Sequence, residues 1–352
     1  MRPNIPALTS LRFFAALTVV VFHYGVARPS PWFHADFGYE AVTFFFILSG
    51  FVLVYAHGIP DGSLNVSLKA FIKSRFVRIG PAYYIAIVIV ISLYFTAGIL
   101  SRLNSVTLGL VLTMLQSWTP KFALSVNLPA WSLSNEMFFY LLFPFFWRAT
   151  CRMGLVQSLT VSLGLVLVAA FARALSYADA DEIMSSFRRY FPLLNLPQFI
   201  LGISLGYAMI AGPYSKRKHA TFFVTGMLAL AILVVLQLSF GWLSNSVTMS
   251  AICSSIIFGA AGIGGIVQSA LSFRPLVILG EASYSIYILH FPIWLWWNHY
   301  TRIAYSIDWP PALGFGIYLS IVLTISIAAL FWLERPAKRI LRVERPWFKS
   351  TF

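Results

Sequence analysis

Charged side chains are scarce in this sequence of 352 residues, in which Asp, Glu, Lys and Arg together make up only 10%. A soluble domain carries about 25% charged residues, so this scarcity excludes a soluble globular protein, a disordered chain and a coiled coil. Acidic residues are the rarest, with 11 Asp and Glu against 25 Lys and Arg. Only two cysteines are present, which excludes a small fold held together by disulfides.

Hydrophobic residues are abundant instead, at 59% of the chain with a mean hydropathy of +0.80. A membrane-spanning helix needs about 20 mainly apolar residues to cross roughly 30 Å of hydrocarbon. The runs that meet this requirement are residues 7–26, 39–58, 79–100, 129–147, 155–175, 191–211, 220–239, 247–268, 276–297 and 311–333. We therefore expect an all-α, polytopic membrane helical bundle of ten spans, with residues 1–352 forming a single domain.

The distribution of basic residues predicts the orientation of these spans. An eleventh apolar run, 106–118, is too short to cross; if it does not cross and the N-terminus is cytoplasmic, 17 Lys and Arg lie inside and 6 outside. Cytoplasmic loops are enriched in Lys and Arg. We therefore expect both termini in the cytoplasm, a basic cytoplasmic tail at 334–352, and a re-entrant or interfacial helix at 106–118. The positive charge thus reflects orientation and indicates no nucleic-acid partner.

Ionisable side chains inside a span are functional hypotheses by default, because they are costly in lipid. They are Arg12, His23, Glu136, Arg173, Glu281 and His290. Arg12 also interrupts the first apolar run, so we expect that run to be a retained span and not a cleaved signal peptide. Arg173 and Glu281 lie near span ends, where a structural role is favoured. A lone histidine on an apolar helix is commonly a core residue, and this interpretation is favoured for His290.

Arg12 and His23 are expected on one face of the first span. Their separation of eleven residues corresponds to three helical turns plus 20°, and to about 16 Å along the axis. Each residue either serves chemistry or satisfies a polar partner in the bundle. Counting from the outer end of its span places Glu136 at a depth of about 10 Å, near the level of His23. We therefore expect the His23 imidazole and the Glu136 carboxylate to meet.

Arg75 and Arg78 lie three residues apart at the inner end of the third span, so they are neighbours on a helix. Two adjacent guanidinium groups suit phosphate oxygens, although anchoring to anionic lipid is an ordinary alternative. A cationic inner mouth and an outer imidazole together suit acyl-coenzyme A, a phosphorylated nucleotide on a long arm that ends in a thioester. A neutral histidine near that thioester is a suitable general base for an acceptor hydroxyl.

Several short motifs occur at these positions, and although some of them are weak by themselves, their order and spacing along the whole chain form a specific pattern. They are Leu8–Phe13 with His23-Tyr24, Phe44–Phe51, Arg75–Arg78 with Pro81, Trp131–Tyr140 with Pro144, Gly280, Ser283–Pro292 and Glu334–Pro336. In these the chain resembles the integral-membrane acyltransferase 3 family, which includes bacterial O-acetyltransferases of polysaccharides. The resemblance implies that Arg12 and His23 are essential and that Arg75 and Arg78 bind the nucleotide of coenzyme A. The further candidates in the same active region are Glu136, Trp131, Ser132, Ser134, Tyr140, Tyr284 and His290.

The predicted function is transfer of a short acyl group, acetyl in the first instance, from cytoplasmic acyl-coenzyme A to a hydroxyl of an envelope glycan, secreted glycan or lipid-linked oligosaccharide. His23 is the expected general base and Glu136 the residue that holds or polarises it. Arg12 is expected to line the path of the acyl-coenzyme A cofactor. We expect a protein of the bacterial cytoplasmic membrane with no metal. Two alternatives stay open, namely a transporter or flippase that uses the buried charges, and an acyltransferase that acts on a small hydrophobic acceptor such as a macrolide.

Overall fold

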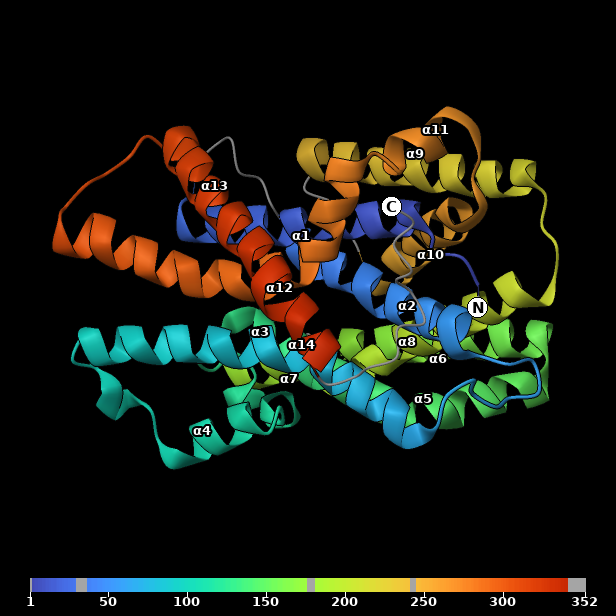
Figure 1. Ribbon diagram of the computed structural model, residues 1–352, viewed down its shortest axis with the longest axis horizontal. Helices are drawn as coiled ribbons and strands as arrows, with labels where there is room; N and C mark the ends of the chain where they lie inside the picture. The colour runs from blue at the N-terminus through green and yellow to red at the C-terminus, as the bar shows by residue number, and fades with distance from the viewer. Residues whose placement is uncertain (1, 30–36, 176–180, 241–244, 341–352) are drawn as a thin grey trace.

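The computed structural model describes residues 2–29, 37–175, 181–240 and 245–340, and within these residues it is helical without a strand. This confirms the all-α prediction. The helices are α1 Pro6–Ala27, α2 Gly38–His57, α3 Leu68–Thr96, α4 Ser105–Leu112, α5 Trp131–Met153, α6 Leu155–Leu175, α7 Glu182–Tyr190, α8 Pro192–Ala211, α9 Lys216–Phe240, α10 Ser246–Gly262, α11 Gly265–Leu271, α12 Arg274–Asn298, α13 Pro311–Ala329 and α14 Arg335–Ile340. Figure 1 shows that most of the long helices run along the long axis of the molecule, while α13 crosses them obliquely.

Eight helical segments of the described chain are long and apolar enough to cross a membrane, and a ninth is the bent pair α10 and α11. The predicted span 247–268 is interrupted there, because α10 ends at Gly262 and the chain bends by 98° before α11. The predicted span 129–147 corresponds to α5, which has 23 residues but is less apolar than the others. The structure thus supports a polytopic membrane protein, and the count of ten spans stays a prediction. The predicted tail 334–352 begins at the last residue of a π-helical turn, Leu330–Glu334, and continues in α14; its residues 341–352 lie outside the described part.

Close contact at glycines brings the helices of the central bundle together. A Cβ atom on Gly50 of α2 would collide with the carbonyl oxygen of Phe199 in α8, and one on Gly202 of α8 would collide with that of Ile47. In the same way, a Cβ on Gly280 of α12 would collide with the carbonyl oxygen of Thr9 in α1. Only glycine allows backbones to approach so closely. The first two contacts hold α2 against α8, and the third holds α12, which carries His290, against α1, which carries Arg12 and His23.

The predicted short helix at 106–118 is observed as α4, followed by a 3₁₀ turn at Gln116–Trp118. The hydroxyls of Tyr83 and Tyr84, in the middle of α3, donate to the carbonyls of Val111 at 2.7 Å and Leu112 at 3.0 Å. The chain leaves α3 at Thr96, so it has turned back along this helix by roughly 18 Å, twelve residues at 1.5 Å each. Of the two expected alternatives, this geometry favours the re-entrant one.

The segment after α4 continues into the bundle and sets where α5 begins. Asn127 Nδ2 donates to the carbonyl of Ile288 in α12 at 3.0 Å. That carbonyl needs an outside donor, because the residue four positions later is Pro292, which has no N–H to complete the helical bond. Gln116 Nε2 donates to the carbonyl of Ala130 at 3.1 Å. These bonds place the first residue of α5 inside the protein and not at its outer surface.

Candidate active site

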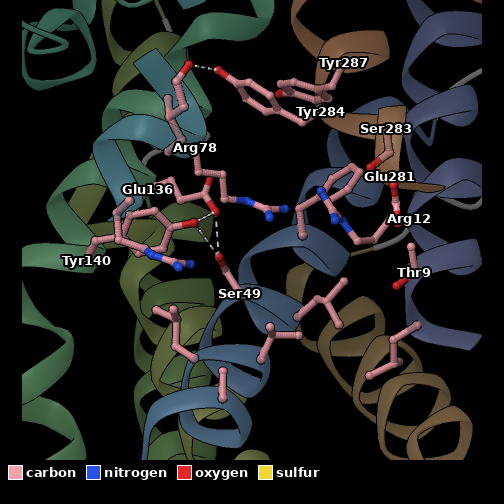
Figure 2. Close-up of a pocket in the computed structure, with 18 of the residues that line it drawn as sticks. Thr9, Arg12, Ser49, Arg78, Glu136, Tyr140, Glu281, Ser283, Tyr284 and Tyr287 are labelled. Atoms are coloured by element: carbon pink, nitrogen blue, oxygen red, sulfur yellow. Dashed lines mark hydrogen bonds between the residues drawn. The ribbon is translucent and has the colours of Figure 1, made fainter. Parts of the chain in front are cut away.

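A cavity of about 240 Å³ lies between α1, α2, α3, α5 and α12, and the chain from Leu330 to Lys338 closes one side. Its walls are mainly apolar, with polar side chains that converge on the centre (Figure 2). Predicted site residues that line it are Arg12, Arg75, Arg78, Ser132, Glu136, Tyr140 and Tyr284. The fold therefore collects seven candidates from four helices that are distant in sequence.

Three arginines define the charge of this cavity. Arg12 of α1 and Arg78 of α3 extend toward one another across it (Figure 2). The Arg75 guanidinium lies over the rings of Phe71 and Tyr140, at 5.7 and 5.8 Å from their centroids, and its Nε donates to the hydroxyl of Ser74 at 3.1 Å. Within the described chain, none of the three has a carboxylate oxygen within 4.0 Å. Half-buried cations without an ion-paired carboxylate among the described residues make this cavity chemically suited to an anion.

Glu136 is held by hydroxyl groups. Its Oε1 accepts a hydrogen bond from Ser49 at 2.6 Å and another from Tyr140, and the Ser49 and Tyr140 oxygens are themselves 3.1 Å apart (Figure 2). Ser49 of α2 belongs to the Phe44–Phe51 motif, but sequence reasoning gave it no role. Its position between Leu48 and Gly50 was the available signal, since a hydroxyl in an otherwise apolar span needs a polar partner.

The other two carboxylates that line the cavity are paired with positively charged side chains. Glu281 Oε2 lies 2.7 Å from an Arg335 nitrogen, which agrees with its predicted structural role. Glu334 accepts from Ser285 at 2.6 Å and lies 3.6 Å from the Lys338 ammonium. The positive charge of the three cavity arginines is therefore not neutralised by Glu281 or Glu334.

Arg173 also has its predicted structural role, because it donates to the backbone carbonyls of two residues and to a side-chain amide oxygen at 2.7 to 3.0 Å.

His23 and His290 form a pair beyond the end of the cavity. His23 Nδ1 lies 2.9 Å from His290 Nε2, and the ring centroids are 5.0 Å apart. His290 is completely buried in α12, whereas His23 of α1 is half-buried. His290 is thus a buried core residue with satisfied ring nitrogens, as the favoured interpretation expected, and its ring is also bonded to the predicted base.

The expected meeting of His23 with Glu136 does not occur: among the described contacts, each has a different partner. The depth of α5 explains this difference. Ser132 near the start of α5 is 2.8 Å from the hydroxyl of Tyr287, which precedes His290 by almost one turn. Glu136 lies a further turn along α5, so it is roughly 10 Å, or seven residues of helical rise, from the histidine pair. The sequence count wrongly assumed that α5 starts at the outer surface.

The remaining candidates have structural surroundings. Trp131 stacks on Tyr39 at 5.8 Å between centroids. Ser134 is buried, and its hydroxyl has no hydrogen-bond partner within the described chain. The Tyr284 hydroxyl donates to the carbonyl of Ile79 at 2.5 Å, which ties α12 to α3 beside the arginines. Sequence reasoning missed Tyr287 as a site residue. This tyrosine lines the cavity, and its ring and the His290 ring pack in an edge-to-face arrangement.

Proteins similar to this chain are acyltransferases. The acyltransferase MdmB of Streptomyces mycarofaciens is 27% identical over 97% of this chain and 94% of its own length. The O-acetyltransferase OatA of Staphylococcus aureus is 26% identical over 84% of this chain, and the putative peptidoglycan O-acetyltransferase YrhL of Bacillus subtilis is 27% identical over 95%. The chain spans about half the length of these two relatives, 51% of OatA and 55% of YrhL. No solved structure matches it.

The sequence pattern of one family matches almost the entire chain. This family is described as an acyltransferase domain, and the match covers residues 5–331. The matched region contains most of the cavity lining, including its three arginines, and the histidine pair. The protein therefore belongs to the acyltransferase 3 family and is an acyltransferase.

Proposed function

We propose that this protein transfers a short acyl group, acetyl in the first instance, from cytoplasmic acyl-coenzyme A to a hydroxyl of an envelope glycan. The observation that carries the proposal is the cluster of Arg12, Arg75 and Arg78 in one cavity, where no carboxylate oxygen of the described residues lies within 4.0 Å of their nitrogens. Phosphate groups supply the negative charge that such a cluster lacks, and guanidinium groups bind them through two parallel hydrogen bonds. Coenzyme A carries phosphates at one end and the acyl thioester at the other.

The position of the arginines fits a donor that arrives from the cytoplasm. Arg75 and Arg78 lie in the first half of α3, at the end that the positive-inside pattern assigns to the cytoplasmic face. Ser132 and Tyr287 line the cavity, and they lie between Glu136 and the histidine pair. In this proposal the nucleotide stays with the arginines, and the flexible arm passes Ser132 and Tyr287 so that the thioester reaches His23.

His23 is the proposed general base. In the direct route, its unprotonated ring nitrogen takes the proton of the acceptor hydroxyl, and the hydroxyl oxygen attacks the thioester carbonyl carbon. The C–S bond then breaks, and the leaving sulfur takes the proton from the His23 imidazolium, which gives an ester and the free thiol of coenzyme A. Replacing His23 by Ala removes the base, so we expect turnover to fall by about 10²- to 10⁴-fold.

The acceptor is proposed from orientation and from the relatives. His23 lies near the end of α1 that is predicted to face outward, where a cell-envelope glycan is accessible. OatA is named an O-acetyltransferase, and YrhL a putative peptidoglycan O-acetyltransferase. Membership of an acyltransferase family favours acyl transfer over the transporter or flippase alternative.

The test uses membranes that contain the full chain, mass-tagged acetyl-coenzyme A, and either peptidoglycan fragments or a macrolide as acceptor. Each charged hydrogen bond contributes about 1.5–3 kcal/mol, so the double variant Arg75→Gln, Arg78→Gln should raise the KM for the donor by about 10²-fold or more. The matched control is Arg148→Gln, Arg152→Gln, two exposed arginines of α5 outside the cavity. Equal KM values for the two double variants would refute the donor site, and tagged macrolide without tagged glycan would refute the acceptor.

A further inference from the structure

The contacts of the His23 and His290 rings determine which nitrogen atom of each ring carries a hydrogen. The two nitrogen atoms are 2.9 Å apart, the ring centroids 5.0 Å apart, and the ring planes differ by 30°. With nitrogens so close and planes so nearly aligned, the rings meet through their nitrogen edges. This is a hydrogen bond in which one nitrogen donates and the other accepts.

The backbone of α12 decides which nitrogen donates. His290 Nδ1 lies 3.2 Å from the carbonyl oxygen of Ile286, one turn earlier. A carbonyl oxygen can only accept, so His290 Nδ1 carries a hydrogen. In a neutral imidazole the other nitrogen is then an acceptor, so His290 Nε2 accepts from His23 Nδ1. The neutral His23 ring therefore has its hydrogen on Nδ1 and a lone pair on Nε2.

The surroundings keep His290 in this position. Its side chain is completely buried, and its backbone carbonyl accepts from the Tyr318 hydroxyl at 2.9 Å. Asn127 binds the carbonyl of Ile288, which Pro292 leaves without a helical donor. The backbone on both sides of His290 is thus tied to α13 and to the segment before α5. A ring held in this way can orient a partner ring without moving itself.

We propose that His290 is a positioning residue that holds His23 in the tautomer with a basic Nε2 and stabilises the imidazolium formed during acyl transfer. When His23 Nε2 takes the hydroxyl proton, the positive ring continues to donate from Nδ1 to His290 Nε2, and this hydrogen bond strengthens because its donor is charged. His290 stays neutral throughout and touches no substrate. This inference rests on the proposed function, in which His23 is the base.

The first test reads the tautomer directly and needs no turnover. The full chain is labelled with ¹⁵N-histidine in lipid nanodiscs, and the His23 signals are identified by their absence in His23→Ala. We expect the wild-type His23 ring to carry hydrogen on Nδ1, and the His290→Phe variant to show a mixture of tautomers. A wild-type His23 ring protonated on Nε2 would overturn the inference, whatever the acyl-transfer assay shows.

The second test separates positioning from packing. His290→Phe keeps a ring but removes the acceptor, so kcat should fall by about 10²-fold while the KM for the acyl donor stays unchanged, because the arginine cavity lies elsewhere. His290→Gln offers an amide oxygen as acceptor and should recover part of this loss. The control is His219→Phe, another buried histidine on a different helix, α9. Equal kcat for the Phe and Gln variants would assign His290 to packing alone.

The two proposals fail in different ways. If His23→Ala turns over as fast as the wild type, His23 is not the base and the proposed mechanism fails. If His23→Ala is inactive while His290→Phe keeps the wild-type kcat, only the positioning role is overturned.

Discussion

The bond between Asn127 and Ile288 gives a prediction that links Pro292 of α12 to the segment before α5. Pro292 leaves the Ile288 carbonyl without its helical donor, and Asn127 Nδ2 replaces that donor at 3.0 Å. The variant Asn127→Ala removes this replacement and leaves a buried carbonyl unpaired. In a Pro292→Ala background, the new backbone N–H can serve Ile288, so Asn127 should no longer be needed.

The magnitude follows from two opposing effects. An unpaired buried acceptor costs about 1–3 kcal/mol. The Asn127 Oδ1 atom, however, is itself buried without a partner among the described residues. Removing this unpaired atom stabilises the protein and so offsets part of the loss in unfolding free energy. We therefore expect Asn127→Ala to lower the free energy of unfolding by about 1 kcal/mol in the wild-type background and to be neutral or stabilising in the Pro292→Ala background. The coupling energy should be about 1–2 kcal/mol, at the upper end of hydrogen bonds measured in membrane proteins.

The assay is a double-mutant cycle on the purified protein, unfolded by titration with denaturing detergent and followed by tryptophan fluorescence. The matched control is Asn104→Ala, which removes the Oδ1 that accepts from the Thr107 N–H at 2.7 Å at the start of α4. That cap is not bonded to α12, so its effect should add to that of Pro292→Ala. A cycle in which Asn127→Ala costs the same in both backgrounds would refute the reasoning.

Two other predictions concern helix contact and charge. Gly280→Val would push a Cβ into the Thr9 carbonyl and separate α1 from α12. We therefore expect the free energy of unfolding to fall by about 1–3 kcal/mol and acyl transfer to be lost. The control Gly164→Val, with no atom within 4 Å of the added Cβ, should change neither quantity. Glu136→Gln keeps an acceptor for its two hydroxyl partners but removes a negative charge beside three arginines. Calorimetry should show coenzyme A binding several-fold tighter, and weaker binding would contradict an anion site.

Much of the fold could be predicted because a lipid-spanning helix leaves a strong local signal. Apolar length alone located the long helices, and the short length of 106–118 singled out α4. The pairing of Arg75 with Arg78 also followed from helical spacing, since both line the cavity. The partner of His23 did not follow, because it depends on how deep each helix starts. Asn127 and Pro292 set that depth across 165 positions of sequence.

The sequence by itself determined that this is a helical membrane protein of the acyltransferase 3 family, because hydrophobic length, basic-residue distribution and motif order are all properties of the linear chain. Only the tertiary structure decided that Glu136 binds Ser49 and Tyr140, and that His23 binds His290. The physical reason is that hydrogen bonds form within about 3 Å, whereas a depth counted along a helix is off by roughly 5 Å for each turn by which its start is misplaced.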